Sequence, residues 1–392
     1  MTRRYDVAIA GGGPAGSAAA WQALRTGARV VVLDKAEFPR DKPCGDGLTP
    51  RATGYLQRMG LADEIAKFHR INRAKIFSPS QWELTLPRRV GMPDHGHGIR
   101  RRELDTMLLD NAAAAGAEVR QGAEVVGPLV DDDGRVTGVT LKSGEKVLAD
   151  AVIAADGAYS PVKRGLTLDS QYNGYTAIAI RAEMPANRPD SDSLDIYLKV
   201  RFQGDQLPGY GWVFPLGGGQ VNIGVGYVNS YKHWQKINST QFLGEFMATL
   251  PREWELPSIA ELQKSKALQG WRLPMGFTAW PPWRPGVLFA GDALGAGKPV
   301  SGAGISKALE SGLTAGECAV AALMNGGPDD FTNYQQRLSA AWGREYRRGR
   351  FFNKLAGIPA VAEAGLKALD NHRFRDLLLK SLYKKAQSPR HT

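Results

Sequence analysis

The sequence predicts an α/β fold in which a parallel-sheet domain is interrupted by an antiparallel-sheet domain and followed by a helical segment. Two short apolar runs, Tyr5–Ala10 and Arg29–Leu33, flank an alanine-rich helical pattern over Ser17–Thr26 and so predict one βαβ unit. The stretch from Tyr175 to Tyr227 instead alternates and is rich in turn residues, which is typical of antiparallel strands. From Asp330 to the end of the chain, the pattern is helical.

The remaining elements follow from apolar periodicity and from turn residues at their ends. We expect a helix over Arg102–Ala115, a strand over Ala117–Val126, a hairpin of Arg135–Leu141 and Lys146–Ala149, strands over Ala151–Ala155 and Val287–Ala290, and a helix from about Gly302 to Met324. The parallel-sheet domain is therefore discontinuous. We expect this domain over residues 1–75, 95–165 and 280–330, the antiparallel substrate domain over 76–94 and 166–279, and the helical segment over 331–392.

The composition is that of an ordinary globular protein with an excess of basic residues. Of 392 residues, 43% are hydrophobic and 23% are charged, and the formal net charge is +11. Such an excess fits nucleic acid, an anionic membrane surface or phosphorylated ligands. The basic residues are scattered and no aromatic-basic motif accompanies them. We therefore expect no nucleic-acid partner, and we favour a solvated basic surface over one that binds a membrane.

Cysteine usage and the chain's two ends bear on localisation. Cys44 and Cys318 form no disulfide framework, which indicates a reducing compartment. No signal-peptide pattern precedes the first strand, so we expect a cytoplasmic protein. Leucines and basic residues over 373–385 have the pattern of an amphipathic helix. This helix either docks peripherally on the inner face of the membrane or packs back on the parallel-sheet domain.

A glycine loop joins the first strand to the first helix. Gly11, Gly13 and Gly16 fit the pattern G-x-G-x-x-G. The first glycine permits the turn, the second lets the backbone approach a pyrophosphate, and the third lets helix and strand pack closely. Free N–H groups at the helix start favour the negative charge of a phosphate. Asp34 ends the next strand, where a ribose-binding carboxylate belongs, so the loop predicts a dinucleotide, either NAD or FAD.

Two further strand ends favour FAD. Asp292 follows Gly291 at the end of a buried strand, where a carboxylate can accept a hydrogen bond from a ribityl hydroxyl. The helix that begins near Gly302 can point its N-terminus at the O2 side of an isoalloxazine ring and stabilise the reduced flavin. Asp156-Gly157 ends another buried strand.

Together, these motifs resemble those of the FAD-dependent family that includes aromatic hydroxylases, flavin halogenases and geranylgeranyl reductases. The resemblance spans residues 5 to 325 or so and implies a Rossmann-like FAD-binding domain of the aromatic-hydroxylase type. Arg101 and Asp105 match the family's R-x-x-L/F-D helix start, which implies that Arg101 contacts FAD and that Asp105 is structural. The expected FAD contacts are Gly11, Gly13, Pro14, Ala15, Gly16, Asp34, Lys35, Cys44, Gly45, Arg101, Val125, Asp156, Gly157, Asp292, Pro299, Gly302, Ala303, Gly304 and Ile305.

Two stretches resemble one branch of this family, the geranylgeranyl and menaquinone reductases, which reduce isoprenoid double bonds. Residues 42–50 resemble the segment K-P-C-G-x-G-L, and residues 210–226 resemble the signature Y-x-W-x-F-P with its following G-x-G strand. The chain departs from the family's N-P-x-x-G-E-G-I segment, because Lys298 and Ala303 replace the usual Asn and Glu. These departures leave the identity of the substrate open.

An isolated alkene offers no charge for recognition, so its reduction needs an apolar surface that places it against the hydride donor and a proton source. Alternation puts Tyr210, Trp212 and Phe214 on one face of a strand, where they line an apolar tunnel, form the core of the antiparallel sheet, or do both. We expect these three residues and Gly226 to contact substrate. Cys44, Tyr210 and Trp212 are the candidate catalytic residues, with Cys44 positioning substrate, relaying a proton or being merely structural.

The sequence therefore predicts an FAD-dependent reductase of isoprenoid C=C bonds that acts on a hydrophobic small molecule. NADPH, NADH and ferredoxin are all candidate electron donors, and the absence of a second G-x-G-x-x-G loop argues against a separate nucleotide domain. The alternatives are an FAD monooxygenase or halogenase of an aromatic or polyketide-like metabolite, and a flavin-bound scaffold. His95 and His97 lack further ligands, so we expect no metal. Oligomeric state cannot be read from the sequence.

Overall fold

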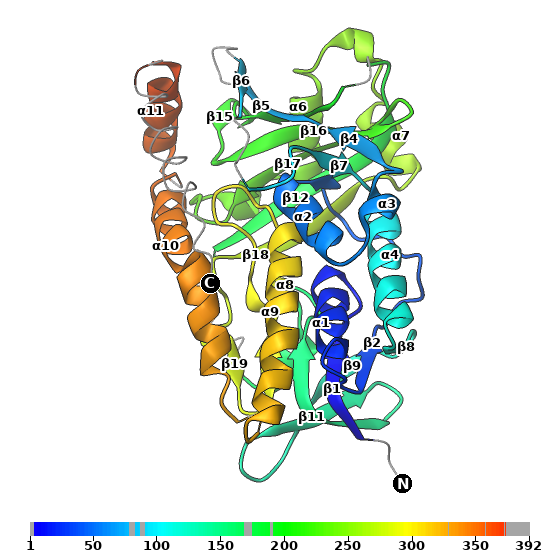
Figure 1. Cartoon of the computed structure of the whole chain (residues 1–392). Helices are drawn as coiled ribbons and strands as arrows, with labels where there is room; N and C mark the ends of the chain where they lie inside the picture. The colour runs from blue at the N-terminus through cyan, green and yellow to red at the C-terminus, as the bar shows by residue number, and fades with distance from the viewer. Residues whose placement is uncertain are drawn as a thin grey trace. The chain divides into compact units, whose positions relative to one another are not determined.

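The computed structural model describes residues 4–77, 83–86, 91–167, 175–188, 191–327, 329–356, 358–371 and 373 (Figure 1). Contacts within the chain divide it into two compact units. We call Met1–Lys42, Arg101–Thr176 and Leu273–Phe351 the parallel-sheet unit, and Pro43–Arg100, Ala177–Arg272 and Phe352–Thr392 the antiparallel-sheet unit. The predicted amphipathic helix lies almost wholly outside the described residues.

The parallel-sheet unit is built on an eight-stranded sheet. Its strands are β1 (Arg4–Ala10), β2 (Val30–Leu33), β8 (Glu118–Arg120), β9 (Val125–Val130), β10 (Val136–Leu141), β11 (Lys146–Ala154), β19 (Trp283–Arg284) and β20 (Val287–Phe289). The order is β19-β20-β11-β1-β2-β8, with β10 beside β11 and β9 beside β10. The neighbours from β20 to β8 run parallel, and β1 and β2 are apolar because the sheet buries both of their faces.

The helices of this unit are α1 (Pro14–Leu24), α4 (Arg101–Ala114), α5 (Pro161–Gly165), α8 (Gly291–Leu294), α9 (Ile305–Met324) and α10 (Thr332–Ala356). Two of them begin at a start signal: α1 at Pro14, and α5 at Pro161 after the N-cap Ser160. Helices α1 and α9 lie side by side in Figure 1. They approach closely because Gly312 has no side chain: a Cβ there would lie only 2.1 Å from the Ala15 carbonyl oxygen. Among the described residues, no helix is both long and apolar enough to cross a membrane.

The antiparallel-sheet unit holds a seven-stranded sheet in the order β18-β12-β17-β16-β13-β5-β6. Its strands are β5 (Arg73–Phe77), β6 (Glu83–Thr85), β12 (Tyr175–Pro185), β13 (Ser193–Tyr197), β16 (Gly209–Gly217), β17 (Gln220–Val228) and β18 (Gln269–Met275). A three-stranded sheet, β3 (Gly47–Leu48), β7 (Gly96–Gly98) and β4 (His69–Ile71), and helices α2 (Pro50–Arg58), α3 (Ala62–Ile65), α6 (Ser239–Met247), α7 (Ile259–Lys264) and α11 (Pro359–Asp370) complete it.

Three features differ from the sequence-based expectation. Residues 43–75, expected in the parallel-sheet domain, group with the antiparallel-sheet unit, because β5 pairs with β13 and the segment at Gly45–Gly47 packs on β16. The single strand expected over Ala117–Val126 is interrupted by a turn at Gly122, where φ is +68°, and becomes β8 and the start of β9. Helix α9 begins at Ile305, because Gly302 is still in the preceding turn with φ of +63°.

Candidate functional site

The glycine loop between β1 and α1 contains one position that is open to a ligand. A Cβ on Gly11 would lie 2.4 Å from Ala155 O, and one on Gly16 would lie 1.8 Å from Gly11 O, so packing excludes a side chain at both. Gly13 differs. Its backbone is extended, with φ −75° and ψ −173°, and a Cβ there would meet only Arg40 Nη2 at 3.5 Å and Arg101 Nη2 at 3.9 Å. Two guanidinium groups therefore border the space above Gly13.

A buried network of charges holds these two arginines. Arg101 donates from Nε and Nη2 to the two carboxylate oxygens of Asp105, at 2.8 and 2.7 Å, and Arg40 Nη1 donates to Asp105 Oδ2 at 2.9 Å. Asp105 is fully buried and Arg101 is 5% exposed. Such bidentate pairing fixes the plane of the Arg101 guanidinium beside the glycine loop. Asp105 thus has the structural role that the resemblance implied, and the arginines fit the pyrophosphate of FAD.

Asp34 connects this network to the glycine loop. Its carboxylate accepts hydrogen bonds from Gly12 N at 2.7 Å and Ala36 N at 2.9 Å, and Arg40 Nη2 lies 3.9 Å away. The carboxylate therefore holds the loop in shape at the end of β2. The other two residues expected here lie in different surroundings. Lys35 is exposed beside Asp34, and Val125 is buried in the apolar core at the start of β9.

Asp292 stands at the end of β20, as the motif predicts, and pairs with a lysine from a distant part of the chain. Lys42 Nζ donates to Asp292 Oδ2 at 2.9 Å. Burial raises the pKa of Asp292, but the charge and hydrogen bond of Lys42 outweigh burial, so the pKa lies below its usual value. The carboxylate is therefore ionised at neutral pH and can accept a hydrogen bond from a hydroxyl. Its fit to a ribityl group is a second match to FAD.

The turn before α9 is fixed to α10 by the residue that departs from the family pattern. Lys298 Nζ lies 2.9 Å from the Glu345 carboxylate, and Lys298 N donates to Ala303 O at 3.4 Å. The next residue of α10, Tyr346, donates its hydroxyl proton to Ala296 O. The replacement of Asn by Lys298 thus adds an ion pair between the turn and α10.

The predicted flavin-binding residues of this turn lie where the helix starts. Gly304 is the N-cap of α9 and Ile305 is its first residue. Gly302 N donates to Lys298 O at 3.0 Å. Pro299 packs against Gly349 of α10, since a Cβ there would lie 2.7 Å from Pro299 Cβ. The structure brings Pro299 to Ile305 together at one helix N-terminus, where N–H groups are available to an electron-rich ring.

Asp156 ends β11 next to Gly157, and its ionisation is unfavourable. Asp156 Oδ2 accepts a hydrogen bond from Val162 N at 3.2 Å. Burial raises the pKa of Asp156 to about 6, despite the opposing effect of hydrogen bonds from Ser160 and Val162 and of the Lys163 charge. The carboxyl group consequently changes its charge within the range of pH in which proteins are usually handled.

We expect Asp156→Asn to stabilise the protein at neutral pH. The folded protein raises the pKa of this carboxyl from about 4 in the unfolded chain to about 6. The protonated carboxyl therefore stabilises the folded state fully when the pH is below about 4, and this stabilisation is lost as the pH rises through about 6. The amide does not ionise, so the variant escapes this loss. The free energy of unfolding of the variant minus that of the wild type should be about 2 kcal/mol larger at pH 7.5 than at pH 4. Urea unfolding of both proteins at these two pH values measures the difference. A constant difference across this range would contradict the argument.

In the antiparallel-sheet unit, the three predicted aromatic residues of β16 lie on one face. Ring centroids of Tyr210 and Trp212 are 6.0 Å apart, and those of Trp212 and Phe214 are 6.2 Å apart. The opposite face packs on α6. Val213 belongs to the apolar core of this unit, and a Cβ on Gly211 would lie 2.5 Å from the Phe246 ring. These three residues, which we call the aromatic row, are not part of that apolar core. Trp212 is nevertheless buried, so whether the row also lines a tunnel stays a prediction.

The segment that contains Cys44 packs against the aromatic row. A Cβ on Gly45 would lie 3.2 Å from Phe214 Cε2, and one on Gly47 would lie 2.9 Å from Phe214 Cδ2. Burial, and after it the nearby Cys44, raises the pKa of Tyr210 to about 12. The structure thus brings Cys44, Tyr210 and Phe214 together, a contact that neither motif predicted by itself.

Strand β17 pairs with β16 next to the aromatic row. Gly224 pairs with Trp212, and a Cβ on Gly224 would lie 2.2 Å from Trp212 Cζ2, so the indole lies directly over the glycine. Gly226 pairs with Tyr210 and is 3.8 Å from Trp212 Cζ3 by the same measure. The indole therefore explains Gly224, whereas a Cβ on Gly226 would have only ordinary contacts.

Three residues of these sites were not predicted. Arg40 lies in an irregular stretch with no motif, and only the structure shows its approach to Gly13. Lys42 begins the K-P-C-G-x-G-L segment, so the motif itself carried a signal for it. Asn222 lies on β17, two residues before the G-x-G glycines, and has no distinguishing pattern. Cys318, by contrast, is buried in α9 as expected.

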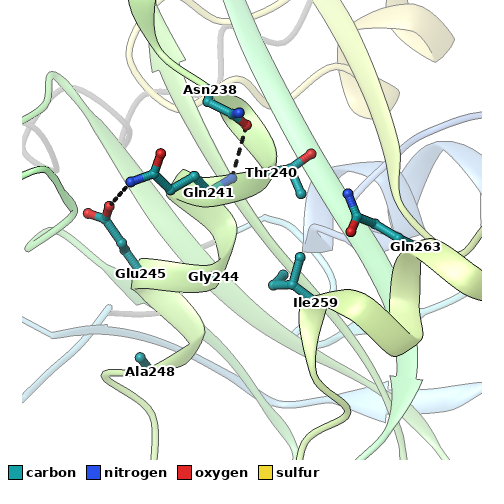
Figure 2. Close-up of a pocket in the computed structure, with 8 residues that line it drawn as sticks. All are labelled: Asn238, Thr240, Gln241, Gly244, Glu245, Ala248, Ile259 and Gln263. Carbon is teal, nitrogen blue, oxygen red and sulfur yellow. Dashed lines mark hydrogen bonds between the residues drawn. The ribbon is translucent and has the colours of Figure 1, made fainter.

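One open depression on the surface contains none of the predicted site residues. Figure 2 shows it between α6 and α7, lined by Asn238, Thr240, Gln241, Gly244, Glu245, Ala248, Ile259 and Gln263. Its polar groups bond to one another: Asn238 Oδ1 accepts from Gln241 N at 3.1 Å, and Gln241 Nε2 donates to Glu245 at 2.9 Å. The depression therefore offers no group arranged for chemistry.

Known proteins resemble this chain over most of its length. The profile of the FAD binding domain family matches residues 4–343. A menaquinone reductase of Mycolicibacterium smegmatis is 36% identical over 364 residues, which is 92% of this chain and 86% of that protein. A digeranylgeranylglycerophospholipid reductase of Methanopyrus kandleri is 31% identical over 354 residues, 88% of this chain and 87% of that one. The crystal structure of a geranylgeranyl bacteriochlorophyll reductase-like protein from Thermoplasma acidophilum has a TM-score of 0.79 and 26% identity, and the match covers 94% of this chain and 91% of that one.

Proposed function

Since the chain belongs to the FAD-binding-domain family and is an FAD-dependent oxidoreductase, we propose that it reduces C=C bonds of an isoprenoid, of the prenyl-quinone or geranylgeranyl type. The observation that carries the proposal is the packing of the Cys44 segment on the aromatic row. Both parts match the reductase branch in sequence, and together they make a surface of rings and glycines with few charges. The names of the two relatives, which act on menaquinone and on a digeranylgeranyl lipid, support the same class of substrate.

The chain's residues divide between holding the cofactor and holding the substrate. Gly13, Arg40 and Arg101 would hold the pyrophosphate, and Asp292 a ribityl hydroxyl. Bound FAD, once reduced by the electron donor, would supply the hydride for such a reduction. When hydride adds to one alkene carbon, a proton must reach the other.

Cys44 is the proposed source of that proton, delivered from Sγ to the alkene carbon. Tyr210 is protonated at neutral pH, as tyrosines ordinarily are, so its Oη can donate a hydrogen bond. Burial, which raises its pKa to about 12, makes ionisation still less favourable. Trp212 and Phe214 contribute apolar surface that excludes water from the reacting carbons. NAD(P)H or ferredoxin is the proposed electron donor, and the proposed location is the cytoplasm, with peripheral access to membrane lipid.

Anaerobic reduction of the holoprotein tests the proposal. The reduced protein is mixed with a geranylgeranyl lipid or with menaquinone, the flavin spectrum is followed, and the product is analysed by mass spectrometry. We expect reoxidation of the flavin together with a product that is two mass units heavier per reduced bond. A flavin that stays reduced until oxygen is admitted, followed by a hydroxylated or, with halide present, a halogenated product, would establish the monooxygenase or halogenase alternative.

We expect Cys44→Ser to slow alkene reduction by about 100-fold while FAD remains bound, since general acid catalysis contributes factors of this order. A hydroxyl is a far weaker acid than a thiol, and Cys44 lies outside the parallel-sheet unit that holds the glycine loop. Single-turnover rates and the flavin absorbance of purified protein measure the two effects. Cys318→Ser is the control, because this thiol is buried in α9. Equal rates for Cys44→Ser and wild type would show that the thiol is structural.

A further inference from the structure

Asn222 lies in the antiparallel-sheet unit, where the Cys44 segment meets the aromatic row. It is fully buried on β17, where it pairs with Phe214 of β16 on one side and with Glu183 of β12 on the other. Its side chain is on the face that carries the aromatic row. No role was expected for Asn222 from its sequence context, yet it touches each part of the site that the two motifs bring together.

The oxygen and both N–H groups of the Asn222 carboxamide form hydrogen bonds with these two parts. Trp212 Nε1 donates to Asn222 Oδ1 at 2.9 Å. Asn222 Nδ2 donates to the Cys44 carbonyl oxygen at 2.8 Å and to Asp46 Oδ2 at 2.7 Å. An indole N–H can only donate, and a carbonyl and a carboxylate can only accept, so these partners allow one orientation of the amide.

The bonds of Asn222 act on a backbone that is held in an unusual conformation. Asp46 has φ of +58°, which is in the left-handed region that few residues other than glycine adopt, and its side chain is fully buried. Such a conformation persists only where surrounding contacts determine it. The bond from Nδ2 to the Asp46 carboxylate is one such contact, and the bond to Cys44 O fixes the residue two positions earlier.

We propose that Asn222 is a positioning residue, which fixes the Cys44 segment and the Trp212 indole relative to each other. The inference rests on the proposed function for its catalytic meaning, although the positioning itself is a property of the fold. Loss of the carboxamide leaves the indole N–H, the Cys44 carbonyl and the Asp46 carboxylate without this partner. Buried groups that lose a partner carry a large penalty, so the segment should open toward solvent.

The rate at which Cys44 reacts with iodoacetamide tests the positioning without any enzyme assay. The chain has two cysteines, and Cys318 is 4% exposed, so it serves as the internal reference. The holoprotein variant Asn222→Ala should be alkylated at Cys44 about tenfold faster than wild type, with Cys318 unchanged. Asn187→Ala is the matched control, because this asparagine is exposed and its side chain makes a weak bond of 3.4 Å to Glu255, while its backbone bond to Trp254 O survives the substitution. Alkylation of Cys44 at the wild-type rate would overturn the inference.

Kinetics provide the second readout, and its failure can be told apart from that of the proposed function. In Asn222→Ala we expect kcat for alkene reduction to fall about tenfold while flavin content stays at the wild-type level. If the wild type itself reduces no alkene, the proposed function fails and the alkylation rates alone decide on Asn222. If Asn222→Ala does not fold, Asn222→Ser, which is small and polar but cannot bridge the three groups, takes its place in both measurements.

Discussion

Gly13→Val should abolish FAD binding and leave the fold intact. Packing excludes a side chain at Gly11 and Gly16, so substitutions there disturb the apoprotein itself. The backbone of Gly13 is extended, a conformation that any residue can adopt. A Cβ at Gly13 would come near only the ends of the Arg40 and Arg101 side chains, so the apoprotein should tolerate valine. The valine would instead occupy the space that the pyrophosphate needs. We expect the dissociation constant for FAD to rise by at least roughly 100-fold, or about 2.7 kcal/mol.

Fluorescence titration of apoprotein with FAD measures this effect, and circular dichroism checks the fold. Gly343→Val is the control, since Gly343 lies within α10 and a Cβ there has only ordinary contacts, the nearest at 3.6 Å. FAD binding of Gly13→Val at the wild-type affinity would mean that the cofactor does not approach the loop at this glycine.

Asp105→Ala should destabilise the protein by about 3–5 kcal/mol, which is the usual consequence of removing one partner of a buried ion pair. The carboxylate accepts three hydrogen bonds from Arg101 and Arg40, and its removal leaves both guanidinium groups buried or half-buried beside each other without their anion. Urea unfolding of the apoprotein gives the change in the free energy of unfolding. Apoprotein is required because a bound anionic ligand would offset part of the loss.

The matched control is Asp110→Ala on the same helix. Asp110 is exposed, so its removal should change stability by less than about 0.5 kcal/mol. Comparable losses for the two variants would show that the network at Asp105 contributes nothing specific. A small loss for Asp105→Ala alone would mean that the two arginines find other partners or move into solvent.

The sequence predicted the elements that a local pattern specifies. The strand, glycine loop and helix of residues 4–24 were recognisable because one βαβ unit buries a continuous apolar run and because its glycines fit a known spacing. Close packing requires Gly16 within that unit, and it requires Gly11 against the chain after β11. The alternation of Tyr210, Trp212 and Phe214 likewise placed three rings on one face, since strand geometry alone decides this. The family inferred from these motifs is confirmed by the match over residues 4–343.

What the sequence did not predict depends on contacts between distant segments. Arg40 reaches Gly13 and Asp105 from a stretch without regular structure, and no periodicity reports such an approach. Residues 43–75 were assigned to the other domain because the pairing of β5 with β13 joins positions that are 120 residues apart, as at Arg73 and Ser193. Asn222 is one polar residue in an apolar strand, and its three partners come from two other segments. Its role is visible only once those segments are folded together.

The two faces of β16 have a consequence for how such an enzyme can change. Val213 and Gly211 meet α6 and the apolar core, while Tyr210, Trp212 and Phe214 meet the Cys44 segment, so adjacent positions answer to different demands. On the proposed function, a substitution at Gly211 or Val213 would lower stability, whereas one at Tyr210, Trp212 or Phe214 would alter the surface offered to the substrate. A change of substrate would then proceed along one strand, at every second residue, without rebuilding the core that holds it.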